Sequence, residues 1–106
     1  MDKANLTLDF ELMRGNATHA SNFLKTLANA DRLLLLCQLS QTEMCVSELE
    51  TATGIKQPTL SQQLTVLRSE NLVNTRRDGK QIYYSISSQE ALSIMQLLYE
   101  QFCKKN

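Results

Sequence analysis

The chain of 106 residues carries three cysteines, Cys37, Cys45 and Cys103, and a single histidine, His19. A deprotonated thiol can exchange with disulfides, take up sulfane sulfur or bind a soft metal. The chain has no C-x-x-C pair and no grouping of a nucleophile with a base, so the sequence predicts that the protein is not an enzyme. Each cysteine could also serve as an ordinary small apolar residue, and the sequence leaves the distances between the thiols open.

The length and the charge pattern limit the classes of protein that fit. One domain is expected over residues 1–106, and a domain this small often completes its core by pairing with a second copy. The net charge is zero, but residues 54–86 carry five basic and two acidic side chains, whereas residues 1–53 carry four basic and seven acidic ones. A local basic excess favours a surface that faces phosphate groups. The chain has no apolar run long enough for a bilayer and no apolar signal core, which predicts a cytoplasmic protein with reduced thiols and no membrane partner.

Most of the chain has helical periodicity. We expect helices over residues 8–27, 30–39 and 88–103, and a pair of helices within residues 46–70 that is interrupted at Gly54. Asn29, Ser47 and Ser88 are suited to cap the helices that follow them. Pro58 is expected in the first turn of the second helix of the pair.

The period then changes to that of strands. Residues 72–76 and 81–86 alternate, and Asp78-Gly79 between them is a strong hairpin turn, so residues 72–86 predict a two-stranded wing. The order helix, turn, helix, hairpin predicts a winged helix-turn-helix: a mainly α fold with a small β-hairpin wing, five helices and two strands, in a homodimer.

The second helix of such a pair lies in the major groove of double-stranded DNA, with its early residues at the base edges. The polar side chains of that segment suit hydrogen bonding to bases, and the basic side chains of the wing suit phosphate or the minor groove. The candidate DNA-binding residues are Lys56, Gln57, Thr59, Ser61, Gln62, Gln63, Arg68, Arg76, Arg77 and Lys80.

At these residues the sequence resembles a known family. GIKQPTLSQQLTVLRSENLVNTRRDGKQIYYSI, residues 54–86, resembles the DNA-binding core of the ArsR/SmtB repressors, and LKTLANADRLLLLCQL, residues 24–39, resembles the segment that precedes it. The resemblance runs from about residue 8 to residue 103. It implies a homodimer built on the helices over 8–27 and 88–103, an inverted-repeat operator, and release of DNA when an inducer binds.

Many members of this family sense metals. The stretch from Glu43 to Leu49 resembles one of the family's metal-binding phrases and keeps its first cysteine as Cys45, but Ser47 replaces the second, and a hydroxyl is a poor substitute for a thiolate. Residues 88–106 lack the Asp and His of the family's other common site. We therefore expect no metal site and no cofactor. A metal-responsive repressor that uses Cys45, with His19 across a dimer, stays open as the alternative.

Cys37 and Cys103 match the two cysteine positions of a subgroup of the family, the BigR/SqrR-type sulfide-responsive repressors, to which the HlyU-type regulators are related. QPTLSQQL and the closing LY..FC also resemble this subgroup. The resemblance implies that reactive sulfur species or oxidants link Cys37 to Cys103 through a disulfide or polysulfide, and that the repressor then releases its operator. Cys45 is a departure from the subgroup's pattern.

Overall fold

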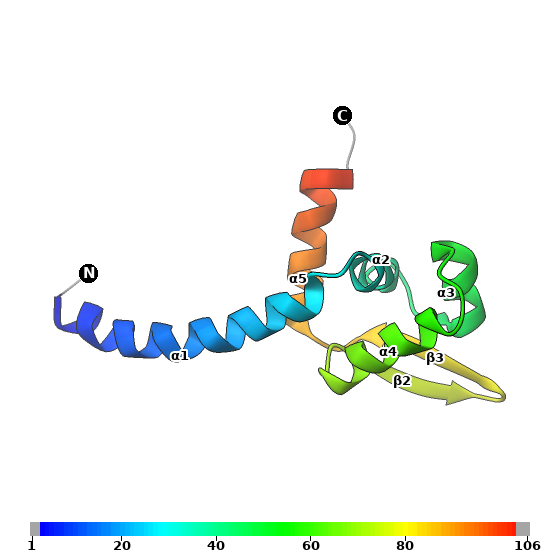
Figure 1. The fold of residues 1–106 in the computed structure, drawn as a ribbon, viewed down its shortest axis with the longest axis horizontal. Coiled ribbons are helices and arrows are strands. Elements are labelled where there is room, and N and C mark those ends of the chain that lie inside the picture. The colour runs from blue at the N-terminus through cyan, green and yellow to red at the C-terminus, as the bar shows by residue number, and fades with distance from the viewer. Residues whose placement is uncertain (1–2, 104–106) are drawn as a thin grey trace.

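The computed structural model describes the backbone of residues 3–103 and the side chains of residues 10–103. Figure 1 shows a mainly helical body with a β-hairpin that projects from it, as the sequence predicts. The elements run in the order α1 (Lys3–Leu27), α2 (Ala30–Leu39), β1 (Met44–Cys45), α3 (Val46–Thr53), α4 (Thr59–Ser69), β2 (Val73–Asp78), β3 (Gln81–Ile86), α5 (Gln89–Leu98) and a π-helical turn η1 (Tyr99–Cys103).

Short polar side chains and a glycine set several helix ends, as expected. The Asn29 side chain accepts the Arg32 N–H at 3.0 Å at the start of α2, and the Ser88 hydroxyl accepts the Ala91 N–H at 3.0 Å at the start of α5. Gly54 ends α3 at φ 75°, in the left-handed region where a residue with a Cβ is strained.

Other helix ends differ from the sequence prediction. The first helix begins at Lys3, five positions before the predicted start. Cys45, not Ser47, is the capping position of α3, and the Glu48 carboxylate accepts the Cys45 N–H at 3.0 Å. Pro58 lies just before α4, which begins at Thr59.

The sheet has three strands among the described residues, so the predicted number of two is wrong. Met44 and Cys45 form the short strand β1, which pairs antiparallel with β3 and gives the order β1-β3-β2. Two residues are too few to show the alternation that identifies a strand in a sequence. In the hairpin Asp78 pairs with Gln81, so the turn consists of Gly79 and Lys80, one position later than expected.

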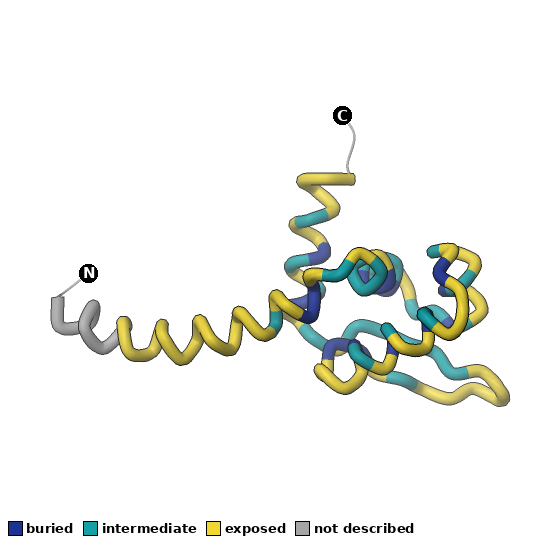
Figure 2. The backbone as a smooth tube through the Cα atoms, in the orientation of Figure 1, coloured by how far each residue is buried: buried dark blue, intermediate teal, exposed yellow. Residues whose placement is uncertain are grey.

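The core lies between α2, α3 and α4. Six leucines are fully buried there: Leu35 and Leu36 of α2, Leu49 of α3, and Leu60, Leu64 and Leu67 of α4. The last three repeat at helical spacing and turn one face of α4 inward, which leaves its opposite face in solvent (Figure 2). The core therefore fixes which side of α4 can meet a ligand.

Helix α1 extends away from this body and is exposed along most of its length (Figures 1 and 2). Among its residues with described side chains, 10–27, only Thr26 and Leu27, near its end, are buried. Its apolar side chains Phe10, Met13 and Leu24 are 60%, 62% and 53% exposed. None of the helices in the described part of the chain has the length and apolar character to cross a membrane.

Candidate DNA-reading surface and thiol groove

Helix α4 and the loop before it present the polar residues that the sequence singles out. Lys56, Gln57, Ser61 and Gln62 are exposed, whereas Thr59 is half-buried. The Gln57 side chain accepts the Ser61 N–H at 3.1 Å and so occupies one of the free donors at the start of α4. The start of α4 and the tip of the β2–β3 hairpin lie toward the same end of the molecule in Figure 1.

Gln63 differs from its neighbours on α4. It is half-buried, and its side-chain oxygen accepts a hydrogen bond of 2.8 Å from the guanidinium of Arg32 on α2. The predicted base contact is thus already engaged within the subunit. Sequence reasoning missed Arg32, because nothing in the local pattern signals a contact between residues 31 positions apart.

The wing carries three basic side chains in two different environments. Arg77 and Lys80 are exposed near the tip, where the Arg77 Nε donates to the Gly79 carbonyl at 3.1 Å. Arg76 instead donates two hydrogen bonds of 2.7 Å to the Glu43 carboxylate, and its guanidinium lies 4.6 Å from the centre of the Tyr83 ring. Glu43 is the second residue that the sequence prediction missed.

The Arg76 pair changes the titration of the wing. Its hydrogen bonds and charge hold the pKa of Glu43 below the usual glutamate value, and Glu43 in turn raises the pKa of Arg76. Burial, followed by the charges of Cys45, Glu48 and Asp78, raises the pKa of Tyr83. Of the two basic candidates outside the wing, Lys56 and Arg68, the second is exposed in the last turn of α4.

Cys37 and Cys103 line the same groove between α2 and the α5–η1 helix, with a cavity volume of about 640 Å³. Its walls are almost entirely apolar and include Leu33, Leu98 and Phe102. Both thiols are free; Cys37 is half-buried and Cys103 is exposed. Burial, and then the negative charge that Cys103 carries when ionised, raise the pKa of the Cys37 thiol. The fold thus places at one groove two thiols that lie far apart along the chain.

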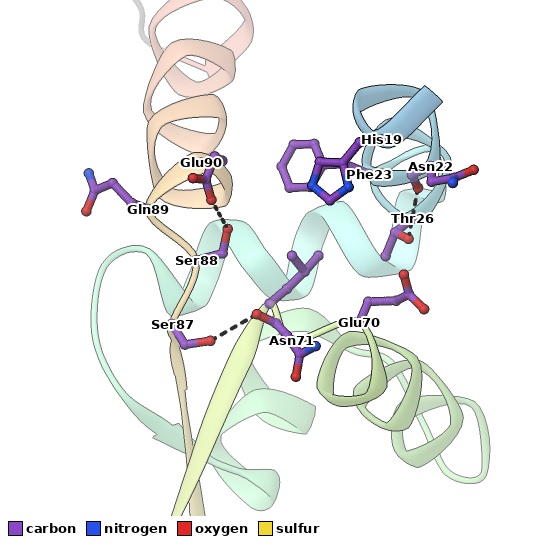
Figure 3. A pocket seen from close by; sticks show the side chains of 11 residues that line it. His19, Asn22, Phe23, Thr26, Glu70, Asn71, Ser87, Ser88, Gln89 and Glu90 are labelled. Carbon is purple, nitrogen blue, oxygen red and sulfur yellow. Dashed lines mark hydrogen bonds between the residues drawn. The ribbon is translucent and has the colours of Figure 1, made fainter. Parts of the chain in front are cut away.

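Cys45 lies apart from this groove. It is only 4% exposed, and its sulfur is 3.3 Å from the Ser47 hydroxyl. His19 lines a different cavity of about 660 Å³, between α1 and the start of α5, together with Glu70 and Glu90 (Figure 3). Among residues whose side chains are described, no three His, Cys, Asp or Glu side chains lie close enough together to hold a metal ion. The described side chains of one subunit therefore do not form a set of metal ligands.

The chain matches known proteins over most of its length. The family described as "Bacterial regulatory protein, arsR family" matches residues 22–75. The chain is 48% identical over 91 residues to the biofilm growth-associated repressor of Agrobacterium fabrum, an alignment that covers 86% of this chain and 78% of that protein.

Two solved structures show the same fold. The transcriptional repressor BigR from Xylella fastidiosa gives a TM-score of 0.82 at 46% sequence identity, covering 90% of this chain and 97% of the other. Reduced HlyU from Vibrio cholerae N16961 gives a TM-score of 0.85 at 37% identity, covering 89% and 99%. The helix-turn-helix, the wing and the length of the match agree, and the chain therefore belongs to the arsR family of bacterial regulatory proteins: it is a DNA-binding transcriptional regulator with a winged helix fold, not an enzyme.

Proposed function

We propose that the protein is a homodimeric repressor that binds an inverted-repeat operator and releases it when reactive sulfur species or oxidants link Cys37 to Cys103. The observation that carries this proposal is that the two thiols line one apolar groove although they belong to different helices. In a cytoplasmic protein both thiols are reduced at rest, so their oxidation is available as a signal.

The exposed apolar side of α1 supports the homodimer. Phe10, Met13 and Leu24 are exposed on α1, which packs against the core of its own subunit near its C-terminal end, at Phe23 and Leu27. A second copy that packs its own α1 and α5 against this α1 would remove the apolar surface from water. Each Å² of apolar surface buried in this way stabilises the dimer by about 25 cal/mol. The dimer then carries two copies of α4, which suits a two-fold symmetric operator.

We assign the DNA contacts from the exposure of each candidate side chain. We assign base contacts to the start of α4, with Gln57, Thr59, Ser61 and Gln62, and phosphate contacts to Lys56 and Arg68. Arg77 and Lys80 at the wing tip are placed to reach phosphate or the minor groove. Gln63 and Arg76, which the sequence also nominates, are engaged with Arg32 and Glu43 in the free protein.

The exposed Cys103 is the thiol that an inducer reaches first. Its thiolate attacks the outer sulfur of an organic persulfide, RSSH, and forms an S–S bond while the thiolate RS⁻ leaves and takes up a proton. The Cys37 thiolate then attacks the Cys103 sulfur and expels hydrosulfide. In sum, two protein thiols and RSSH give one disulfide, RSH and H₂S, so the thiols lose two electrons and the sulfane sulfur gains them.

Longer bridges and other oxidants reach related products. When both cysteines are persulfides, the two groups can condense to a trisulfide, whose three sulfur atoms include the two cysteine sulfurs. This step releases one H₂S. Hydrogen peroxide gives the disulfide through a sulfenic acid at Cys103, with one molecule of water released when the sulfenic acid forms and a second when Cys37 displaces its hydroxyl. The π-helical turn that carries Cys103 also supports a functional role, because such turns are rare and recur at functional sites.

A bridge would tie α2 to the end of the α5–η1 helix, and α2 packs directly against α3 and α4. A shift of α2 therefore moves the reading helix relative to the dimer contacts. The operator holds the two reading helices about 34 Å apart, so a small rotation weakens contacts in both half-sites together.

The test is a DNA-binding titration of the reduced protein and of protein treated with an organic persulfide, with mass spectrometry of the cysteines. We expect tight binding when reduced, weaker binding after treatment, and a Cys37–Cys103 link. Cys37→Ser and Cys103→Ser should keep DNA binding and lose the response, while the control Cys45→Ser should respond like the wild type. A full response in either of the first two variants contradicts the proposal.

A further inference from the structure

Arg32, near the start of α2, connects three helices. Its Nε donates a hydrogen bond to the Thr26 carbonyl, and its Nη2 donates to the Lys25 carbonyl at 3.4 Å; both carbonyls belong to the last turn of α1. Its Nη1 donates to the Gln63 side chain on α4 at 2.8 Å. One guanidinium on α2 thus holds the end of α1 and the half-buried Gln63 of α4 together.

An arginine suits this position for reasons of geometry and charge. The last carbonyls of a helix lack partners within the helix, and the helix dipole favours a positive charge beside them. A planar guanidinium offers several N–H donors in fixed directions, so it can serve two carbonyls and a side-chain amide at once, whereas the single ammonium of lysine cannot keep that geometry.

We propose that Arg32 and Gln63 form a joint that sets the position of α4 relative to α1, and that Gln63 is a positioning residue for DNA recognition rather than a base contact. This inference rests on the proposed function in one respect: it takes α1 as the dimer contact and α4 as the reading helix. Because α1 joins the subunits, the joint determines the distance between the two copies of α4.

The joint therefore controls a property of the operator that no base contact controls. A side chain that reads a base sets the preference at one position of each half-site. A side chain that sets the distance between two rigid heads instead determines the preferred spacing between half-sites, and its loss weakens binding to all sequences alike.

The test compares two adjacent glutamines in the reduced protein. An operator is first selected from a random DNA pool with the wild type, and duplexes are then made with single base changes and with one base pair added or removed between the half-sites. Affinities are measured for Gln63→Met and for the matched control Gln62→Met. Methionine keeps the length of the side chain and removes its hydrogen-bonding groups.

We expect Gln63→Met to bind the selected operator roughly tenfold more weakly, the size of one lost hydrogen bond to a charged group, with unchanged base preferences and a weaker preference for one spacing. Gln62→Met should keep the spacing preference and lose the preference at one base position. A changed base preference and an intact spacing preference in Gln63→Met overturn the proposal.

A second variant separates positioning from a loss of folding. Arg32→Lys should relax the spacing preference as Gln63→Met does, and the double variant should show no further relaxation, because both changes break the same contact. Equal effects on thermal stability with no change in spacing preference would mean that the contact only stabilises the fold, and would overturn the proposal.

The proposed function can fail separately. If the wild type is a monomer by sedimentation or selects a single half-site, the dimer is wrong. The measured base preferences of Gln63→Met then still show whether Gln63 contacts a base. If persulfide leaves wild-type DNA binding unchanged, the thiol switch is wrong, and the measurements on reduced protein stand.

Discussion

Arg76 on β2 holds the carboxylate of Glu43, just before β1, through two parallel hydrogen bonds of 2.7 Å. The pair fastens the wing to the segment that leaves α2, and stacking of the guanidinium on Tyr83 holds it in one orientation. Within this pair the positive charge of Arg76 is largely balanced. Arg77 and Lys80, further along the hairpin, project into solvent.

This difference predicts the salt dependence of DNA binding. Each phosphate contact contributes roughly one unit to the slope of log affinity against log salt concentration. We expect Arg77→Gln and Lys80→Gln each to lower the slope by about one, whereas Arg76→Gln should weaken binding and leave the slope nearly unchanged. Titrations at several salt concentrations measure this, and a lower slope for Arg76→Gln would place Arg76 among the phosphate contacts.

The raised pKa of Cys37 predicts the pH dependence of the thiol reaction. Cys37 is a neutral thiol near neutral pH, so bridge formation should accelerate as the pH rises and level off only above the ordinary thiol range. Cys103→Ser removes the second cause of the shift and keeps the first, burial, so it should lower the Cys37 pKa only in part. The alkylation rate of Cys37 against pH, followed by mass spectrometry, tests this, with Cys45→Ser as control.

The same shift affects stability in a defined direction. The unfolded chain ionises Cys37 at the ordinary thiol pKa, and the folded chain does so only at a higher pH, so ionisation favours unfolding above the ordinary value. The stability should thus decrease over that window, and less so in Cys37→Ser. An equal decrease in both proteins would contradict the assignment to Cys37.

The exposed side of α1 predicts the effect of a charge on assembly. Met13→Glu places a carboxylate within the proposed dimer contact, and we expect the dimer dissociation constant to rise by at least roughly tenfold, since a buried unpaired charge is strongly unfavourable. Thr18→Glu, which adds the same charge on a different side of the helix, is the control. Sedimentation equilibrium measures both, and similar behaviour of the two variants would exclude this face of α1 from the dimer.

Two glycines in different backbone conformations make a matched pair for stability. Gly54 has φ 75° and open space where a Cβ would stand, so Gly54→Ala should cost about 1–2 kcal/mol from backbone strain alone. Gly15 also has open space and lies inside α1, where alanine should stabilise the helix by about 0.5–1 kcal/mol. Urea unfolding at one fixed protein concentration compares the two, and a loss of stability in Gly15→Ala would contradict the account.

The features that the sequence predicts well are those encoded by neighbouring residues. Asn29 and Ser88 were expected as caps because a short side-chain acceptor before an apolar periodic stretch satisfies the free donors at a helix start. Leu60, Leu64 and Leu67 recur at helical spacing in the sequence, which favours one inward-facing side, and all three are buried. These local patterns and their order along the chain predicted the winged helix fold, and the family resemblance implied the same fold.

The features that the sequence could not predict depend on contacts between distant residues. Strand β1 exists because β3 lies beside it, and its two residues carry no periodic signal. The engagement of Gln63 by Arg32, and of Arg76 by Glu43, follows from the packing of α2 and the sheet. The common groove of Cys37 and Cys103 was implied by resemblance only, because residues 37 and 103 belong to helices whose packing no local pattern specifies.

In the proposed dimer, the protruding α1 would make gene control depend on the abundance of the protein. If its apolar side is covered only by pairing, the pool of operator-competent molecules grows with the square of the subunit concentration while subunits remain mostly single. A modest fall in synthesis would then open the promoter disproportionately, even without any chemical inducer. Dilution and sulfur chemistry would act on the same protein as two independent inputs.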